Sequence, residues 1–173
     1  MQHKPLTLLD PSQCLSGRPN VIPGAPPPDA THLVLGTPLY GPWPAGMEVV
    51  GFAMGCVWCT EAVFLHKTPR SALHSTHCGY ANGVTPNPTN AEVHTGRTNH
   101  AEVVRCVYDP ALVSFATLLR IFFESHDPTT ANRQGPDDIG TECVRSSPAP
   151  LMCRQPHDCK NSSLLYYYPA SLV

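Results

Sequence analysis

Apolar residues gather in three runs that predict the strands of one sheet. These runs occupy residues 47–54, 72–81 and 101–108. Each is followed by residues that are typical of turns or breaks: Gly55, Asn82-Gly83 and Asp109-Pro110. The third run, Ala-Glu-Val-Val-Arg-Cys-Val-Tyr, has the clearest strand pattern in the chain.

Two segments have the apolar spacing of helices. The first begins at Cys56 and carries its apolar residues through Phe64. The second begins after Ser114, a residue type that often caps helices, and ends at Asp127-Pro128. The order strand, helix, strand, strand, helix predicts an α+β sandwich in which helices pack on one mixed or antiparallel sheet.

Composition divides the chain into three regions. Ten of the 20 prolines fall in the first 46 residues, so we expect an extended segment at 1–45, whose apolar residues wrap it around a domain. Residues 46–145 hold the predicted strands and helices and form the expected core domain. Four prolines interrupt residues 146–173, which show no periodicity, so irregular structure is expected there.

The overall charge and the apolar runs argue against several classes of protein. The 173-residue chain has a formal net charge of −2 and a pI near 6.5, and its Lys and Arg residues are scattered. Nucleic-acid binding is therefore not expected. The sequence has no run of 18 apolar residues and no apolar signal region at its start, so we expect neither a membrane span nor secretion. The resulting expectation is a cytoplasmic monomer, with an organelle as the alternative compartment.

Cys56 and Cys59 form a Cys-x-x-Cys pair that several kinds of chemistry would explain. A zinc site needs about four ligands, and no second pair of this kind follows. No metal is therefore expected, although His74 and His77 lie on the next predicted strand. Cysteines are also often simply buried. The position of Cys56 favours a reactive thiol. Cys56 follows a predicted strand and opens a predicted helix, where unpaired N–H groups and the helix dipole stabilise a thiolate.

The sequence around this pair resembles a signature of the A-type peptide methionine sulfoxide reductases. Gly55-Cys56-Val57-Trp58-Cys59-Thr60-Glu61 is similar to the family's G-C-F-W-x-x-E. Further similar segments follow in the family's order within residues 46–142: Gly79-Tyr80-Ala81-Asn82-Gly83, then 85–89 (TPNPT), 96–105, 108–110, 126–130, 132–135 and 138–141. The resemblance implies the family's ferredoxin-like α+β sandwich, which agrees with the predicted order of elements.

The resemblance also implies a site and a reaction. Cys56 would attack the sulfur of methionine S-sulfoxide in an oxidised protein or peptide, or in the free amino acid. Glu102 would donate the proton that the departing oxygen needs. Val57, Trp58 and Asp138 would bind the substrate, with Trp58 as one wall of the pocket for its ε-methyl group. A second thiol would then reduce the Cys56 sulfenic acid.

Recycling requires a resolving thiol and an external reductant. Cys59 is the nearest thiol in sequence. Cys143 is the second candidate, because it lies beside an Asp-x-Gly-Thr segment that is near the active site in the family. No cofactor is implied, since the electrons would come from an external thiol or a thioredoxin-like protein.

The chain departs from the family's pattern at positions that matter for activity. Val57 stands where the family has Phe, Asn90 where it has the tyrosine of N-P-T-Y, and Glu142-Cys143-Val144 where it has a Gln-Tyr pair. The segment after residue 145 resembles no part of the family, so we expect a divergent or C-terminally truncated member. Two alternatives stay open: a catalytically impaired or inactive remnant of the same fold that acts as a binding module, and a metal-binding Cys-x-x-Cys protein.

Overall fold

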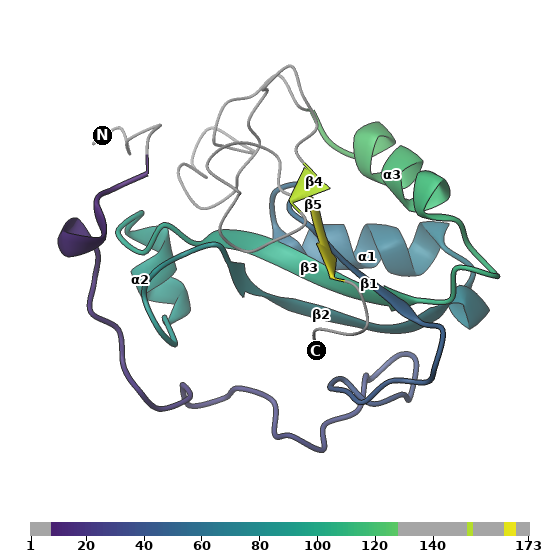
Figure 1. Cartoon of the computed structure of the whole chain (residues 1–173), viewed down its shortest axis with the longest axis horizontal. Coiled ribbons are helices and arrows are strands. Elements are labelled where there is room, and N and C mark those ends of the chain that lie inside the picture. Colours follow the sequence, from purple (N-terminus) through teal and green to yellow (C-terminus); the bar gives the residue numbers. More distant parts are fainter. Residues whose placement is uncertain (1–7, 128–151, 154–164, 169–173) are drawn as a thin grey trace.

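A five-stranded sheet forms the centre of the molecule (Figure 1). The computed structural model describes residues 8–127, 152–153 and 165–168. The strands are β1 (Glu48–Phe52), β2 (Leu73–Ala81), β3 (Ala101–Tyr108), β4 (Met152–Cys153) and β5 (Leu165–Tyr168), in the spatial order β2-β3-β1-β5-β4. The sheet is mixed, because β4 and β5 are parallel whereas the other neighbours are antiparallel.

Two helices pack against this sheet and share one core with it. They are α1 (Val57–Lys67), which follows β1, and α3 (Phe115–Glu124), which follows β3 (Figure 1). The connection between β2 and β3 contains the short helix α2 (Asn90–His94), and two 3₁₀ turns are η1 (Pro11–Gln13) and η2 (Arg70–Ala72). The predicted α+β arrangement is confirmed. None of the described helices has the length and apolar character that crossing a membrane requires.

The observed strand bounds agree closely with the apolar runs. The third run matches β3 residue for residue, the second starts one residue early, and the first extends past both ends of β1. The sequence does not predict α2, because five residues are too few to show helical periodicity. Its start is nevertheless defined locally by a capping box, in which the side chains of Thr89 and Glu92 each accept a hydrogen bond from the other's backbone N–H.

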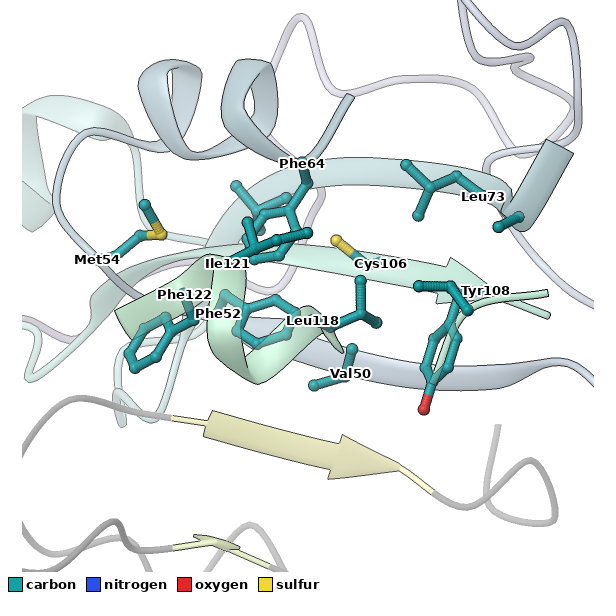
Figure 2. Packing of buried hydrophobic residues seen from close by; sticks show 13 residues of the cluster. Val50, Phe52, Met54, Phe64, Leu73, Cys106, Tyr108, Leu118, Ile121 and Phe122 are labelled. Carbon is teal, nitrogen blue, oxygen red and sulfur yellow. The ribbon is translucent and has the colours of Figure 1, made fainter. Parts of the chain in front are cut away.

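The hydrophobic core lies between the sheet and helices α1 and α3 (Figure 2). Phe52 of β1 stacks on Phe64 of α1, with ring centroids 4.3 Å apart, and its ring lies 5.6 Å from that of Phe122 in α3. All three side chains are almost completely buried, and each such burial contributes about 1.5–3 kcal/mol to stability. This packing holds α1 and α3 against β1.

The N-terminal segment follows the sheet as a largely extended chain (Figure 1), as its proline content predicts. It contacts Arg105 of β3. The neighbours of Arg105 in the strand, Val104 and Cys106, point into the core, and because side chains alternate along a strand, Arg105 points to the face opposite the helices. The Arg105 guanidinium donates a hydrogen bond to the Leu39 carbonyl at 2.5 Å and lies over the rings of Tyr40 and Trp43. The segment therefore covers part of the second face of the sheet.

The two C-terminal strands differ from the irregular structure predicted for residues 146–173. β5 pairs with β1, with Val50 opposite Tyr167, and β4 adds to β5. The physical reason is the run Leu165–Tyr168, an apolar and aromatic segment with high strand propensity. Four residues are too few for alternation to reveal such a strand from the sequence. The domain boundaries after residues 45 and 145 stay predictions.

Candidate active site

A pocket of about 350 Å³ lies at the N-terminal end of α1. It is lined by residues from α1 and the segment before it, from β2, from α2 and from β3. These residues are Cys56, Val57, Trp58, Cys78, Gly79, Tyr80, Asn90, His94 and Glu102. The structure thus brings together four of the residues that the sequence predicts for the site: Cys56, Val57, Trp58 and Glu102.

Cys56 is the N-cap residue of α1, with backbone angles (φ −47°, ψ 119°) outside the helical region. Gly55 before it has a φ of +106°, which residues with a side chain rarely adopt, so glycine suits the turn from β1 into the helix. Cys56 itself is half-buried and lines the pocket. The prediction that this thiol lies at a strand-to-helix transition is confirmed.

Glu102 has a buried carboxyl group, only 6% exposed, on the side of β3 that faces the helices. Its Oε2 accepts a hydrogen bond from the backbone N–H of Val57 at 3.2 Å. This bond holds the carboxylate against the first turn of α1, beside the residue that follows Cys56. Glu102 is therefore not an ordinary solvent-exposed side chain on the surface of a strand.

Trp58 lines the pocket and yet is 75% exposed. An aromatic residue that served the core would be buried, so the position of this ring needs another explanation. Val57 beside it is half-buried. Aromatic and apolar side chains around a few placed polar groups are typical of sites that bind small molecules or side chains.

Five further residues line the pocket without having been predicted for the site: Cys78, Gly79, Tyr80, Asn90 and His94. Asn90 Nδ2 donates a hydrogen bond to the Tyr80 hydroxyl at 2.7 Å, and His94 Nδ1 donates to the Asn90 backbone carbonyl at 2.9 Å. Strand alternation places Cys78 and Tyr80 on one face of β2. Nothing in the sequence shows, however, which face meets Cys56, and α2 is too short to be predicted.

Two other thiols near the core are unsuited to attack a substrate. Cys78 donates a hydrogen bond to the Val57 carbonyl, with 3.6 Å between sulfur and oxygen. Burial, and after it the Glu61 carboxylate, raises the pKa of Cys78 to about 12. Cys106 is completely buried, and this burial raises its pKa well above the ordinary range. Both groups stay protonated near neutral pH, where the thiolate is the reactive form.

The remaining predicted residues are not brought into the pocket. Cys59 is exposed on α1, one turn after Cys56, and is absent from the pocket lining. Asp138 and Cys143 lie outside the described residues. Within the described ranges, no group of three or more His, Cys, Asp or Glu side chains is arranged to hold a metal ion.

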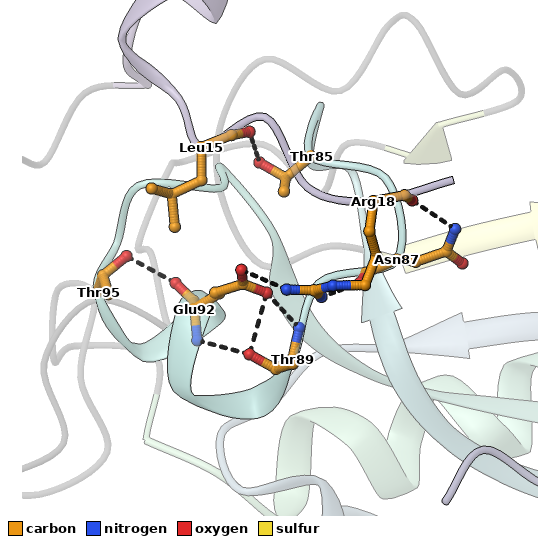
Figure 3. A network of polar contacts seen from close by, with 7 residues as sticks. All are labelled: Leu15, Arg18, Thr85, Asn87, Thr89, Glu92 and Thr95. Atoms are coloured by element: carbon orange, nitrogen blue, oxygen red, sulfur yellow. Dashed lines mark hydrogen bonds and ion pairs between the residues drawn. The ribbon is translucent and has the colours of Figure 1, made fainter. Parts of the chain in front are cut away.

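The N-terminal segment holds α2 in place (Figure 3). Arg18 forms an ion pair with Glu92 at 2.6 Å and donates a second hydrogen bond to the Asn87 carbonyl at 2.6 Å. Asn87 Nδ2 returns a bond to the Arg18 carbonyl at 2.9 Å. The Arg18 guanidinium, and after it the Thr89 backbone N–H, lowers the pKa of Glu92 to about 2. The segment thereby positions the helix that carries Asn90 to the pocket.

A second contact of the N-terminal segment reaches α1 through a buried histidine. His32 Nδ1 accepts hydrogen bonds from the backbone N–H groups of Val34 and Leu35, each at 3.1 Å, so the ring proton lies on Nε2. Nε2 donates to the Thr76 hydroxyl at 2.6 Å, and this hydroxyl donates to Glu61 of α1 at 2.6 Å. Burial lowers the pKa of His32. The segment, β2 and α1 are thus joined by one chain of hydrogen bonds.

Sequence and structure comparisons point to one family. A family model described as "Peptide methionine sulfoxide reductase" matches residues 48–144. The chain is 49% identical over 139 residues to peptide methionine sulfoxide reductase MsrA of Azorhizobium caulinodans, covering 80% of this chain and 60% of that protein. It is 47% identical over 135 residues to the protein of the same name from Salinispora arenicola, covering 78% and 58%.

A solved structure is similar as well. Methionine sulfoxide reductase A of Corynebacterium diphtheriae matches with a TM-score of 0.67 and 41% sequence identity, over 78% of this chain and 59% of that one. The chain therefore spans about 60% of the length of the relatives that it matches.

Proposed function

Because the chain belongs to the peptide methionine sulfoxide reductase family, we propose that it reduces methionine S-sulfoxide in oxidised peptides and proteins to methionine. The observation that carries this proposal is the common pocket of Cys56, Trp58 and Glu102. It combines a thiol at a helix start, a buried carboxyl group and an exposed aromatic wall. Free methionine S-sulfoxide presents the same reacting group and is the second candidate substrate.

In the proposed reaction, the sulfur of Cys56 attacks the sulfoxide sulfur. The S–O bond breaks, the substrate becomes a thioether, and the oxygen ends on Cys56 as a sulfenic acid. One thiol and one sulfoxide thus give one sulfenic acid and one thioether. The oxygen needs a proton as the bond breaks, and Glu102 is the acid of the pocket. The hydrogen bond from the Val57 N–H keeps this carboxyl group beside the nucleophile.

Trp58 and Val57 are proposed to bind the apolar end of the substrate. The exposed indole of Trp58 offers a flat surface to the ε-methyl group next to the sulfoxide. Val57 fills less space than the family's phenylalanine, so the wall beside Trp58 is smaller here. Asp138 stays a predicted binding residue.

A second thiol completes the proposed cycle. It attacks the sulfenic sulfur of Cys56, forms a disulfide and releases water. Cys59 and Cys143 are the candidates within the chain. An external thiol or a thioredoxin-like protein then supplies two electrons and returns both cysteines to thiols, so the proposal requires no bound cofactor.

A single-turnover assay on separate sulfoxide epimers tests this function. The reduced protein is mixed with one equivalent of N-acetylmethionine S-sulfoxide or R-sulfoxide, and the N-acetylmethionine formed is measured. We expect product from the S epimer alone. Cys56→Ser should abolish it, whereas Cys14→Ser, which removes a thiol that does not line the pocket, should not. If the parent protein reduces neither epimer, the non-catalytic binding module is the better description.

A further inference from the structure

We propose that the Tyr80 hydroxyl donates a hydrogen bond to the sulfoxide oxygen of the substrate, with Asn90 holding the phenol in position. This inference rests on the proposed function and adds a substrate-contacting residue to it. Tyr80 lies at the end of β2 and lines the same pocket as Cys56 and Glu102.

The sheet places Tyr80 directly beside the proposed acid. In the antiparallel pairing of β2 with β3, Tyr80 is opposite Glu102. Directly opposed residues point to the same face of a sheet, with Cβ atoms about 4.5–5.5 Å apart. The phenol and the carboxyl group therefore enter the pocket from adjacent positions. One substrate oxygen can lie within reach of both groups.

The hydrogen bond to Asn90 determines what the Tyr80 hydroxyl can do. The Asn90 amide nitrogen donates to the phenol oxygen at 2.7 Å, so this oxygen acts as the acceptor there. A phenol also has one O–H to donate. Among the described residues, no side chain or backbone group accepts that proton in a hydrogen bond. The donor is available to a ligand in the pocket.

The hydroxyl also keeps its proton under working conditions. Burial raises the pKa of Tyr80. The hydrogen bond from Asn90 acts to lower this pKa, but its effect is smaller than that of burial. The group is therefore a neutral donor near neutral pH. A sulfoxide oxygen is a strong acceptor that gains negative charge as the S–O bond breaks. A donor placed at that oxygen stabilises the transition state more than the ground state.

The first test compares two Tyr→Phe variants that remove the same atom. Tyr80→Phe deletes the hydroxyl in the pocket, whereas Tyr40→Phe deletes a hydroxyl that donates a hydrogen bond to the carbonyl of Pro26, outside the pocket. In the single-turnover assay with N-acetylmethionine S-sulfoxide, we expect Tyr80→Phe to slow reduction roughly 100-fold, as for the loss of an oxyanion donor. Tyr40→Phe should react at the rate of the parent. Equal rates for the two variants would overturn the proposal.

The second test measures binding and does not depend on turnover. In a Cys56→Ser background, the affinities for N-acetylmethionine S-sulfoxide and for N-acetylmethionine, which lacks the oxygen, are measured by NMR titration. We expect Tyr80→Phe to lower the preference for the sulfoxide about fivefold while thioether binding stays unchanged. An unchanged preference, or no preference in the Cys56→Ser protein itself, would refute the role of Tyr80. A parent that binds selectively but does not turn over would refute only the proposed function.

A third variant covers the case in which Tyr80→Phe disturbs the strand. Asn90 is exposed at the first position of α2, so Asn90→Leu removes the amide donor with little cost to the core. Tyr80 keeps its hydroxyl but loses its anchor. We expect the sulfoxide preference to fall by a factor of about two, less than in Tyr80→Phe. A preference equal to that of the parent would remove Asn90 from the proposal.

Discussion

The backbone N–H of Val57 donates a hydrogen bond to the Glu102 carboxylate, and this contact ties the acid of β3 to the first turn of α1. The two residues are 45 positions apart in the sequence. Because Val57 directly follows Cys56, any shift of the helix start moves the nucleophile and the acid together. The geometry of the proposed reaction therefore depends on one helix terminus and one buried side chain.

Replacing Glu102 by glutamine tests its role as the acid. Glu102→Gln keeps the size of the side chain and an oxygen that accepts from the Val57 N–H, but an amide cannot transfer the proton. We expect single-turnover reduction to slow by about 10²-fold or more. Alkylation of Cys56 should proceed at the parent rate. Glu124→Gln, at the exposed end of α3, is the matched control. Equal reduction rates for Glu102→Gln and the parent would contradict the role.

Limited alkylation should distinguish Cys56 from the other thiols of the pocket and core. With substoichiometric iodoacetamide at pH 7, we expect Cys56 to be labelled before Cys78 and Cys106. The pKa of Cys78 is raised to about 12, and Cys106 is buried and also holds its proton tightly. Peptide mapping by mass spectrometry gives the order of labelling. Earlier labelling of Cys78 or Cys106 would show that the helix-start position does not decide reactivity here.

The sequence predicts those parts of the fold that depend on local patterns. β3 ends at Tyr108, just before Asp109-Pro110, and α1 begins at Val57, two residues after Gly55, so the positions of Cys56 and Glu102 follow from breaks and apolar runs. The partners of these residues do not follow from local patterns. The contact between Glu102 and Val57 needs the register of β3 against β1 and the packing of α1, which are set by the whole core.

Elements that are stabilised by residues far away in the sequence are not predicted by local sequence patterns. α2 has five residues, and its ion pair joins Glu92 to Arg18, 74 positions earlier. β5 exists because β1 offers it an open edge. Tyr80 lies within the segment 79–83 that resembles a family motif, yet its entry into the pocket depends on its pairing opposite Glu102. The loss of tyrosine at position 90 therefore does not remove every phenol from the site.

Low pH should weaken the ion pair between Arg18 and Glu92. The unfolded chain takes up a proton on Glu92 near pH 4.5, whereas in the folded protein its pKa is about 2. The unfolded state therefore binds more protons between these values, and stability falls as the pH falls through this range. We expect the thermal midpoint of the parent to drop more between pH 5 and pH 3 than that of Glu92→Gln. Parallel pH profiles for the two proteins would contradict this contribution.

Protonation of the buried His32 should lower the stability of the fold in a higher pH range than protonation of Glu92 does. Protonation of His32 would put a proton on Nδ1, which accepts from Val34 and Leu35, and burial lowers its pKa below the ordinary value of 6.5. The unfolded chain therefore binds more protons below about pH 6.5, and stability should fall there as the pH falls. His32→Asn should have a lower thermal midpoint at pH 8 and a weaker decline to pH 5.5. A decline as steep as in the parent would assign the effect to other histidines.

The last prediction concerns the thiol that resolves the Cys56 sulfenic acid. One equivalent of N-acetylmethionine S-sulfoxide without reductant should give a Cys56–Cys59 disulfide, detected by peptide mapping. Residues three positions apart on a helix have Cβ atoms about 5–6 Å apart, and a disulfide needs about 4 Å. The N-cap position of Cys56, outside the helix proper, allows this small adjustment. Cys78 is nearer the pocket, but its high pKa leaves almost no thiolate to attack. Cys59→Ser should leave a sulfenic acid that dimedone traps, whereas Cys14→Ser should still form the disulfide. Recovery of Cys56 joined to Cys143 or Cys78 in the parent would exclude Cys59 as the resolving residue.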